Sequence, residues 1–185
     1  ELEKWGLGEN LSLIRLADRP TTIKTRFMAR NQQLLRVDRE RAAAIDQKTE
    51  DAVITNFERM VGNFDAVILS DYDKGLLTRR VISEAIRIAR QKKVFVAVDP
   101  QVKHFRQYGE CDIMTPNEKE ASEGIGRPFP ANDHEVAEIA ALIRRELKLN
   151  NLLITRSQRG MAYFNDKEAV YLPTVARDVF DVTGA

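Results

Sequence analysis

The chain has 185 residues, of which 43% are hydrophobic and 31% are charged, and its formal net charge at pH 7 is +1. This balance gives no whole-molecule reason to expect binding to nucleic acid or to an anionic membrane, because both need a dense basic surface. A single cysteine, Cys111, cannot form an internal disulfide, and no segment approaches the roughly 20 consecutive apolar residues of a membrane span. The two histidines and the cysteine are too scattered for a zinc site. We therefore expect a soluble, cytoplasmic protein that binds neither nucleic acid nor membrane.

The N-terminal part of the chain predicts a β-hairpin and then a helix. Residues Thr21–Ala29 alternate in character, with Ile23 and Phe27 on one face and Lys24 and Arg26 on the other. A turn at residues 30–32 would lead into a second strand over residues 33–38. Thr49 is a suitable N-cap for the following helix, which should end near residue 62.

From residue 66 onward, short apolar runs alternate with amphipathic segments. The runs predict strands at Ala66–Ser70, Val94–Asp99, Asp112–Thr115 and Leu152–Thr155, and the first of them reads as buried on both faces. The segments between them predict helices capped by Thr78 and Asn117 and a long helix at Asp133–Leu149, before a final hairpin of Met161–Phe164 and Ala169–Leu172. This alternation predicts an α/β fold, a three-layer sandwich in which helices cover both sides of a mainly parallel sheet.

Both ends of the chain look incomplete for such a domain. Glu1 begins in what reads as the tail of a helix, with no opening strand before it, and Ala185 ends in a glycine-containing turn of the kind that leads into a helix. We therefore interpret residues 1–185 as one fragment of a single domain that lacks its opening strand and its C-terminal helices.

Polar residues follow each predicted parallel strand. Ligands of open α/β sheets bind beyond the carboxyl ends of the strands, where carboxylates and amides can hold hydrated Mg²⁺ and cations or backbone amides can hold phosphate. Each polar segment also has an ordinary explanation: Asn117 would cap a helix, Glu118 and Glu120 would complement its dipole, and residues 156–160 would form a solvated turn. Their shared location at one edge favours a single site for a phosphorylated ligand and a divalent ion.

Three of these segments together resemble the signature motifs of the ribokinase-like (PfkB) carbohydrate kinases. The terminal residues 181–185 resemble the start of D-x-T-G-A-G-D, Asn117 and Glu120 occupy the two defining places of N-x-x-E, and residues 155–160 resemble T-x-(G/S)-x-x-G. The motifs occur in the family's order and at compatible spacing. The resemblance implies a ribokinase-like fold and an ATP-dependent sugar kinase.

The resemblance also implies roles for individual residues. ATP and Mg²⁺ would be the cofactors, with Asn117, Glu118, Lys119 and Glu120 at the ATP phosphates and with Asn117 and Glu120 organising Mg²⁺ through water. The nucleotide would be lined by Thr155, Ser157 and Gly160, and an anion hole would be formed by Thr183, Gly184 and Ala185. The family's general base would follow Ala185, so no catalytic base is expected within the chain, and the chain alone should be inactive. A requirement for K⁺ stays open.

Within this family, residues 20–26, 30–38, 70–75, 99–100 and 178–185 most resemble the heptose 7-phosphate kinases. That resemblance implies transfer of the ATP γ-phosphoryl group to the C1 hydroxyl of D-glycero-D-manno-heptose 7-phosphate, in ADP-heptose and lipopolysaccharide-core biosynthesis. A fused nucleotidyltransferase domain is frequent in such kinases, and a homodimer paired through a β lid would use Thr21–Asp38. Our own hypothesis, from their positive charge, is that Lys24, Arg26 and Lys74 bind the sugar phosphate, with Asp71 and Asp99 as further substrate residues.

Two alternatives stay open. Another ribokinase-like enzyme could act on a ketose, a nucleoside or an acceptor similar to adenosine 5′-phosphosulfate, since the general motifs do not distinguish these substrates. A nucleotide-binding scaffold domain without catalytic activity could also keep the ATP-binding edge.

Overall fold

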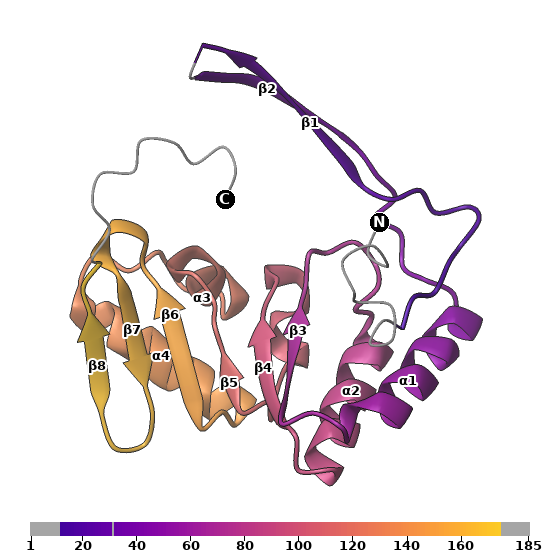
Figure 1. The fold of residues 1–185 in the computed structure, drawn as a ribbon. Coiled ribbons are helices and arrows are strands. Elements are labelled where there is room, and N and C mark those ends of the chain that lie inside the picture. The colour runs from indigo at the N-terminus through magenta and orange to yellow at the C-terminus, as the bar shows by residue number, and fades with distance from the viewer. Residues whose placement is uncertain (1–11, 31, 175–185) are drawn as a thin grey trace.

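A two-stranded hairpin projects from the rest of the molecule (Figure 1). The computed structural model describes residues 12–30 and 32–174. Strands β1 (Ile23–Ala29) and β2 (Gln32–Arg39) pair antiparallel, with Lys24 opposite Asp38 and Arg26 opposite Arg36. Nearly all of their residues are exposed, so the hairpin contributes little to the core of the described structure. The predicted hairpin is confirmed, and its second strand begins one residue earlier than expected.

The other strands form one sheet in sequence order. They are β3 (Ala66–Ser70), β4 (Phe95–Asp99), β5 (Ile113–Met114), β6 (Asn151–Thr155), β7 (Met161–Phe164) and β8 (Ala169–Leu172). Strands β3 to β6 are parallel, and β7 and β8 continue the sheet as an antiparallel hairpin. The predicted α/β class with a mainly parallel sheet is therefore confirmed.

The described residues also form four α-helices: α1 (Gln47–Val61) before β3, α2 (Arg79–Gln91) between β3 and β4, and α3 (Glu118–Gly124) and α4 (Asp133–Leu147) between β5 and β6. Thr78 and Asn117 cap α2 and α3 as predicted. The predicted cap of α1 was wrong: Asp46, not Thr49, is the N-cap, because its Oδ1 accepts the Thr49 N–H at 2.8 Å. Helix α4 ends before residue 149 because Lys148 takes a left-handed conformation with φ 55°.

Within the described residues, helices cover one face of the sheet and leave the other face bare. Side chains such as Val96, Met114 and Leu152 point into a core that α2, α3 and α4 complete, and Figure 1 shows α3 and α4 behind the strands. On the opposite face Ile68 is 70% exposed and Phe95 44%. The expectation that β3 is buried on both faces was therefore wrong, because no described helix covers the face that carries Ile68, and the central strand β4 exposes Phe95 on the same face. The second helical layer of a three-layer sandwich is not formed within residues 12–30 and 32–174.

Two short 3₁₀ helices complete the described structure, η3 (Val102–Gln107) after β4 and η4 (Ser157–Arg159) after β6. Both lie beyond the carboxyl ends of parallel strands. None of the described helices has the length and apolar character needed to cross a bilayer.

Candidate active site

The carboxyl ends of the parallel strands bring the predicted polar residues to one edge of the sheet. Ser70 Oγ donates to Asp99 Oδ2 at 3.2 Å, which joins the ends of β3 and β4. Asn117 forms a parallel bridge with Thr155, and the Thr155 N–H donates to the Pro116 carbonyl at 2.9 Å, which joins the ends of β5 and β6. The structure therefore places these predicted site residues side by side, as parallel pairing requires.

Asn117 and Glu120 form a reciprocal capping box at the start of α3. Asn117 Oδ1 accepts the Glu120 N–H and Glu120 Oε2 accepts the Asn117 N–H, each at 2.9 Å. Burial, and then the negative charge of Asp99, raise the pKa of Glu120 despite the hydrogen bonds from Asn117. The helix-cap interpretation is thus correct, and it uses only one oxygen of Glu120, Oε2, among the described residues.

These donors fit a hydrated Mg²⁺ ion. Glu120 and Asp99 repel each other, and a divalent cation between carboxylates removes such repulsion. Within the described ranges, no three His, Cys, Asp or Glu side chains gather closely enough to hold a metal ion by themselves. Such an ion would therefore keep water or ligand phosphate oxygens in its shell, which is usual for Mg²⁺. When bound, it would neutralise phosphate charge.

The predicted nucleotide loop closes tightly after β6. The Arg156 N–H donates to the Gly160 carbonyl at 2.8 Å, and the Gly160 N–H donates to the Ser157 carbonyl at 3.0 Å. Gly160 has φ +80°, and a Cβ built there would overlap the Leu172 carbonyl oxygen. Only glycine fits this position without strain. Thr155 and Ser157 are exposed beside it.

An ion-pair network that the motifs did not indicate ties this loop to α3. Glu118 is 7% exposed, and its Oε1 accepts from Arg156 Nε at 3.1 Å and from Arg159 Nη2 at 2.7 Å. Arg156 also pairs with Asp133 and lies over the Tyr171 ring, 5.4 Å from its centroid. Burial opposes the charge of Arg156, but its hydrogen bonds to Asp133 and Glu118 outweigh that effect and raise its pKa. Glu118, predicted at the ATP phosphates, therefore contacts two arginines in this structure.

The remaining predicted residue of the helix, Lys119, projects outward. Its side chain is 73% exposed, and its Nζ lies 3.9 Å from Glu123 Oε1, one turn further along α3. A weak surface pair of this kind leaves the ammonium group available to a ligand.

A cavity of about 530 Å³ lies between the start of β1 and the end of β3. It is lined by Thr22, Lys24, Ser70, Asp71, Tyr72, Lys74, Leu76 and Leu77, and we call it the lysine cavity. Lys74 Nζ contacts Glu40 Oε1 at 2.5 Å, so this cation has a carboxylate partner at the end of β2. The structure thus brings together three of the predicted substrate residues, Lys24, Asp71 and Lys74.

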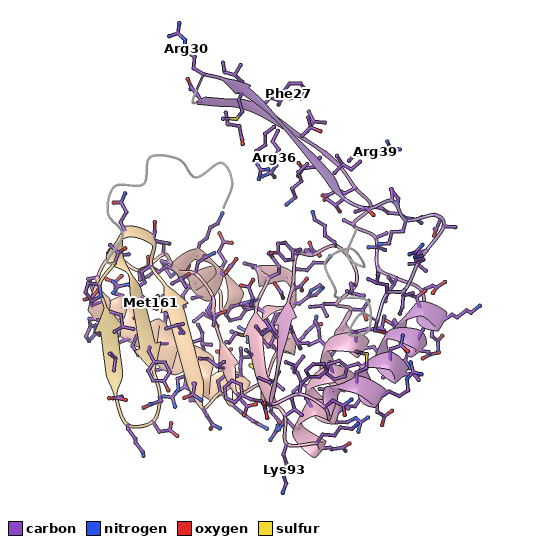
Figure 2. The ribbon with its side chains drawn as sticks, viewed as in Figure 1. Phe27, Arg30, Arg36, Arg39, Lys93 and Met161 are labelled. Atoms are coloured by element: carbon purple, nitrogen blue, oxygen red, sulfur yellow. The ribbon has the colours of Figure 1, made fainter. Side chains whose placement is uncertain are left out.

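The fourth, Arg26, lies further along the hairpin on the same face as Lys24. The strand register puts Arg26 opposite Arg36 on this face, while Phe27 and Leu35 form a pair on the other. Figure 2 shows Arg36 on the side of the ribbon that faces the sheet and Phe27 on the side that faces away. On this face the hairpin therefore presents Lys24, Arg26 and Arg36 towards the strand ends, whereas Phe27 and Leu35 point outward and Arg39, opposite Ile23, shares their face.

The Asp71 carboxylate, another predicted substrate residue, is buried at 4% exposure. It accepts hydrogen bonds from Tyr108 and His104 of the η3 region. The sequence analysis did not identify these two partners. The one signal that could have found them is their spacing of four residues, which puts both side chains on the same side of a helical turn.

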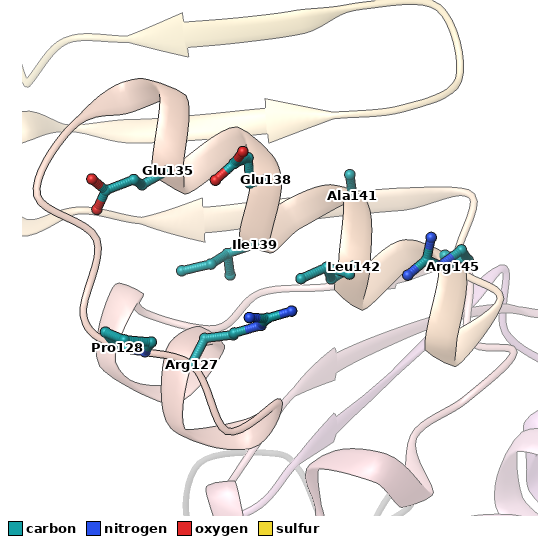
Figure 3. Close-up of a pocket in the computed structure, with 8 residues that line it drawn as sticks. All are labelled: Arg127, Pro128, Glu135, Glu138, Ile139, Ala141, Leu142 and Arg145. Carbon is teal, nitrogen blue, oxygen red and sulfur yellow. The ribbon is translucent and has the colours of Figure 1, made fainter.

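A larger cavity, of about 700 Å³, lies elsewhere (Figure 3). It is formed by Arg127, Pro128 and one side of α4, and none of the predicted site residues that the structure describes lines it. The predicted anion-hole residues Thr183, Gly184 and Ala185 lie outside the described residues. The candidate site accordingly comprises the strand-end edge and the lysine cavity.

Comparison with known proteins identifies the family. The whole chain, residues 1–185, matches the pfkB family carbohydrate kinases. It is 41% identical over 186 residues to the "Bifunctional protein HldE" of Citrifermentans bemidjiense, covering 100% of this chain and 38% of that protein. The protein of the same name from Nitratiruptor sp. is 40% identical over 168 residues, which cover 91% of this chain and 35% of that protein. The chain thus spans little more than a third of these relatives.

Solved structures agree on the fold. Arabidopsis thaliana ribokinase complexed with ribose and ATP superposes with a TM-score of 0.64 at 16% identity, covering 90% of this chain and 53% of that one. Phosphofructokinase-2 from Escherichia coli in complex with potassium gives a TM-score of 0.63 at 14% identity, covering 78% of this chain and 47% of that one. The fold is therefore ribokinase-like, and the chain belongs to the pfkB family of carbohydrate kinases.

Proposed function

We propose that the protein phosphorylates the C1 hydroxyl of D-glycero-D-manno-heptose 7-phosphate with ATP and Mg²⁺, giving the 1,7-bisphosphate. The observation that carries the proposal is the meeting of Asn117, Glu120, Asp99 and Thr155 at one edge, directly beside the lysine cavity. Phosphoryl transfer depends mainly on positioning and on neutralising charge, and this edge offers carboxylate and amide ligands for the cation together with lysines for phosphate.

In this proposal the nucleotide and the sugar occupy neighbouring parts of the edge. Asn117, Glu118, Lys119 and Glu120 act at the ATP phosphates, directly or by holding the helix start, and Thr155, Ser157 and Gly160 line the nucleotide. Thr183, Gly184 and Ala185 form the anion hole. Lys24, Arg26 and Lys74 hold the sugar 7-phosphate, with Asp71 and Asp99 shaping the same end. About 40% identity to relatives named bifunctional supports a further fused domain, for which we propose a nucleotidyltransferase, and the heptose substrate is proposed from the resemblance of residues 20–26, 30–38, 70–75, 99–100 and 178–185 to heptose 7-phosphate kinases.

We further propose that the protein acts in the cytoplasm as a homodimer paired through the hairpin. The outward face of the hairpin carries Ile23, Phe27, Leu35 and Val37, all exposed. A contiguous apolar surface of this kind favours contact with another chain. Sedimentation of Phe27→Lys should give a monomer if this surface forms the dimer, and an unchanged dimer would refute this part of the proposal. Any K⁺ requirement is tested by replacing K⁺ with Na⁺ in the assay.

The substrate is tested with the complete protein, ATP, Mg²⁺ and a panel of acceptors, with product identified by mass spectrometry. We expect heptose 7-phosphate to give the highest kcat/KM and Asn117→Ala to lower it. A ketose or nucleoside that is phosphorylated faster would assign the protein to another branch of the family. ATP binding without transfer to any acceptor would favour the scaffold alternative.

A further inference from the structure

A buried polar network lies behind the loop that carries Lys74. The Asp71 carboxylate accepts three hydrogen bonds: Oδ2 from the Tyr108 hydroxyl at 2.5 Å and from His104 Nδ1 at 2.7 Å, and Oδ1 from the Asp73 N–H at 2.8 Å. This carboxylate is thus committed to partners within the protein.

Both side-chain donors come from the η3 region. Tyr108 is 0% exposed, and burial, followed by its hydrogen bond to Asp71, raises its pKa, so the hydroxyl keeps its proton and donates. His104 donates to the same oxygen in the tautomer that carries its proton on Nδ1. The η3 region is therefore joined by two side-chain hydrogen bonds to Asp71, the residue that follows β3.

The same loop is held from its other side by the stem that joins the hairpin to α1. The Ile45 N–H donates to the Gly75 carbonyl at 2.9 Å, and a Cβ on Gly75 would overlap the Ala43 carbonyl oxygen. Lys74 Nζ contacts Glu40 at 2.5 Å. Residues 71–75 are thus clamped between η3 and the hairpin stem.

A buried carboxylate is a costly way to pack an interior, because apolar side chains of similar volume often stabilise a fold as well or better. A fully satisfied polar network instead fixes one geometry. In this molecule the network holds the chain three residues before Lys74, which lines the lysine cavity together with Lys24. We propose that His104 and Tyr108 are positioning residues for the sugar-phosphate subsite and act through Asp71. The identity of the ligand rests on the proposed function.

The test compares Tyr108→Phe and His104→Leu with wild type in the complete protein. Each variant removes one donor to Asp71, so we expect the KM for the sugar phosphate to rise about tenfold while the KM for ATP changes less than about twofold. His104→Asn keeps an N–H near the position of Nδ1 and should restore most of the sugar KM. A matched control is Tyr163→Phe on strand β7, away from the lysine cavity. It removes a hydroxyl that donates to Asn151 of β6 at 2.5 Å. It should leave both KM values unchanged.

A purely structural role would lower the Tm without separating the two KM values, and that result would overturn the proposal. Hydrogen exchange provides a readout that needs no activity. The backbone amides of residues 71–75 should exchange about tenfold faster in Tyr108→Phe than in wild type, while β6 is unaffected. Unchanged exchange in this loop overturns the positioning role. Absence of sugar kinase activity in the wild type would instead refute the proposed function, and the exchange result would still decide the role of η3.

Discussion

Replacing Glu118 by glutamine should weaken the link between α3 and the nucleotide loop. Glu118 accepts from Arg159 Nη2 with both oxygens, at 2.7 and 2.8 Å, and from the buried Arg156 with Oε1. Glutamine keeps the shape and one oxygen, but its amide nitrogen would face a guanidinium group, which also only donates. The variant therefore loses a charge and at least one charge-assisted hydrogen bond.

The size of the loss follows from burial. Removing one partner of a buried ion pair costs about 3–5 kcal/mol, but Arg156 keeps Asp133 as a partner, so we expect about 2–3 kcal/mol for Glu118→Gln. For a domain of this size that corresponds to a fall in Tm of about 4–12 °C. Because the loop carries Thr155 and Ser157, the KM for ATP should also rise more than the KM for the sugar phosphate.

Thermal unfolding followed by circular dichroism, with steady-state kinetics on the same samples, measures both effects. The matched control is Glu123→Gln, whose carboxylate has, among residues 12–30 and 32–174, only a distant, exposed partner, Lys119, at 3.9 Å. It should change stability by less than about 0.5 kcal/mol. If Glu118→Gln lowers the Tm no more than this control, the network does not hold the loop and the reasoning fails.

Three further changes test other parts of the site. Lys74→Glu should raise the KM for the sugar phosphate far more than the KM for ATP, and an unchanged sugar KM would remove this lysine from the subsite. Gly75→Ala should cost clearly more than Gly126→Ala, because both have positive φ but only Gly75 would meet a backbone oxygen; equal falls in Tm would contradict the close approach. Glu120→Gln should match or exceed wild type in Tm near neutral pH. As the pH falls towards 4.5, the ordinary pKa of a glutamate, the Tm of wild type should rise relative to that of Glu120→Gln. The reason is that the raised pKa of Glu120 in the folded state makes protonation favour folding. A constant difference in Tm would refute the raised pKa.

The sequence was sufficient where a local pattern decides the structure. Thr78 and Asn117 were recognised as caps because each precedes an amphipathic segment, and both predictions are confirmed. Asp46 and Thr49 are both residue types that favour the N-cap, and they are three residues apart. The sequence alone therefore does not decide at which of them α1 begins. The exposure of Ile68 could not be predicted either, because an apolar run reads the same whether one face or both faces of its strand are covered.

The buried contacts of the site depend on tertiary structure alone. Asp71 meets His104 and Tyr108 across 33 and 37 residues of chain, and Glu118 meets Arg156 across 38. No periodicity connects residues at such separations, so the sequence identified the edge of the sheet but not the partners that fix it. The sequence analysis accordingly predicted Asp71 and Glu118 as ligand contacts but did not predict the side chains that donate hydrogen bonds to them.

The charges along the edge divide it into two chemically different parts. At the flanks, cations are already paired with carboxylates, as Lys74 is with Glu40 and Arg159 with Glu118. A phosphate that binds there must replace or share those partners, so its net gain is smaller than a bare lysine would give. In the centre, Glu120 and Asp99 have no cationic partner in the described part of the chain, and burial, together with the negative charge of Asp99, raises the pKa of Glu120. Only a cation relieves that centre, and a divalent ion there would in turn attract phosphate groups from both flanks. The arrangement therefore favours a site in which metal and phosphates bind together, and each should bind weakly without the other.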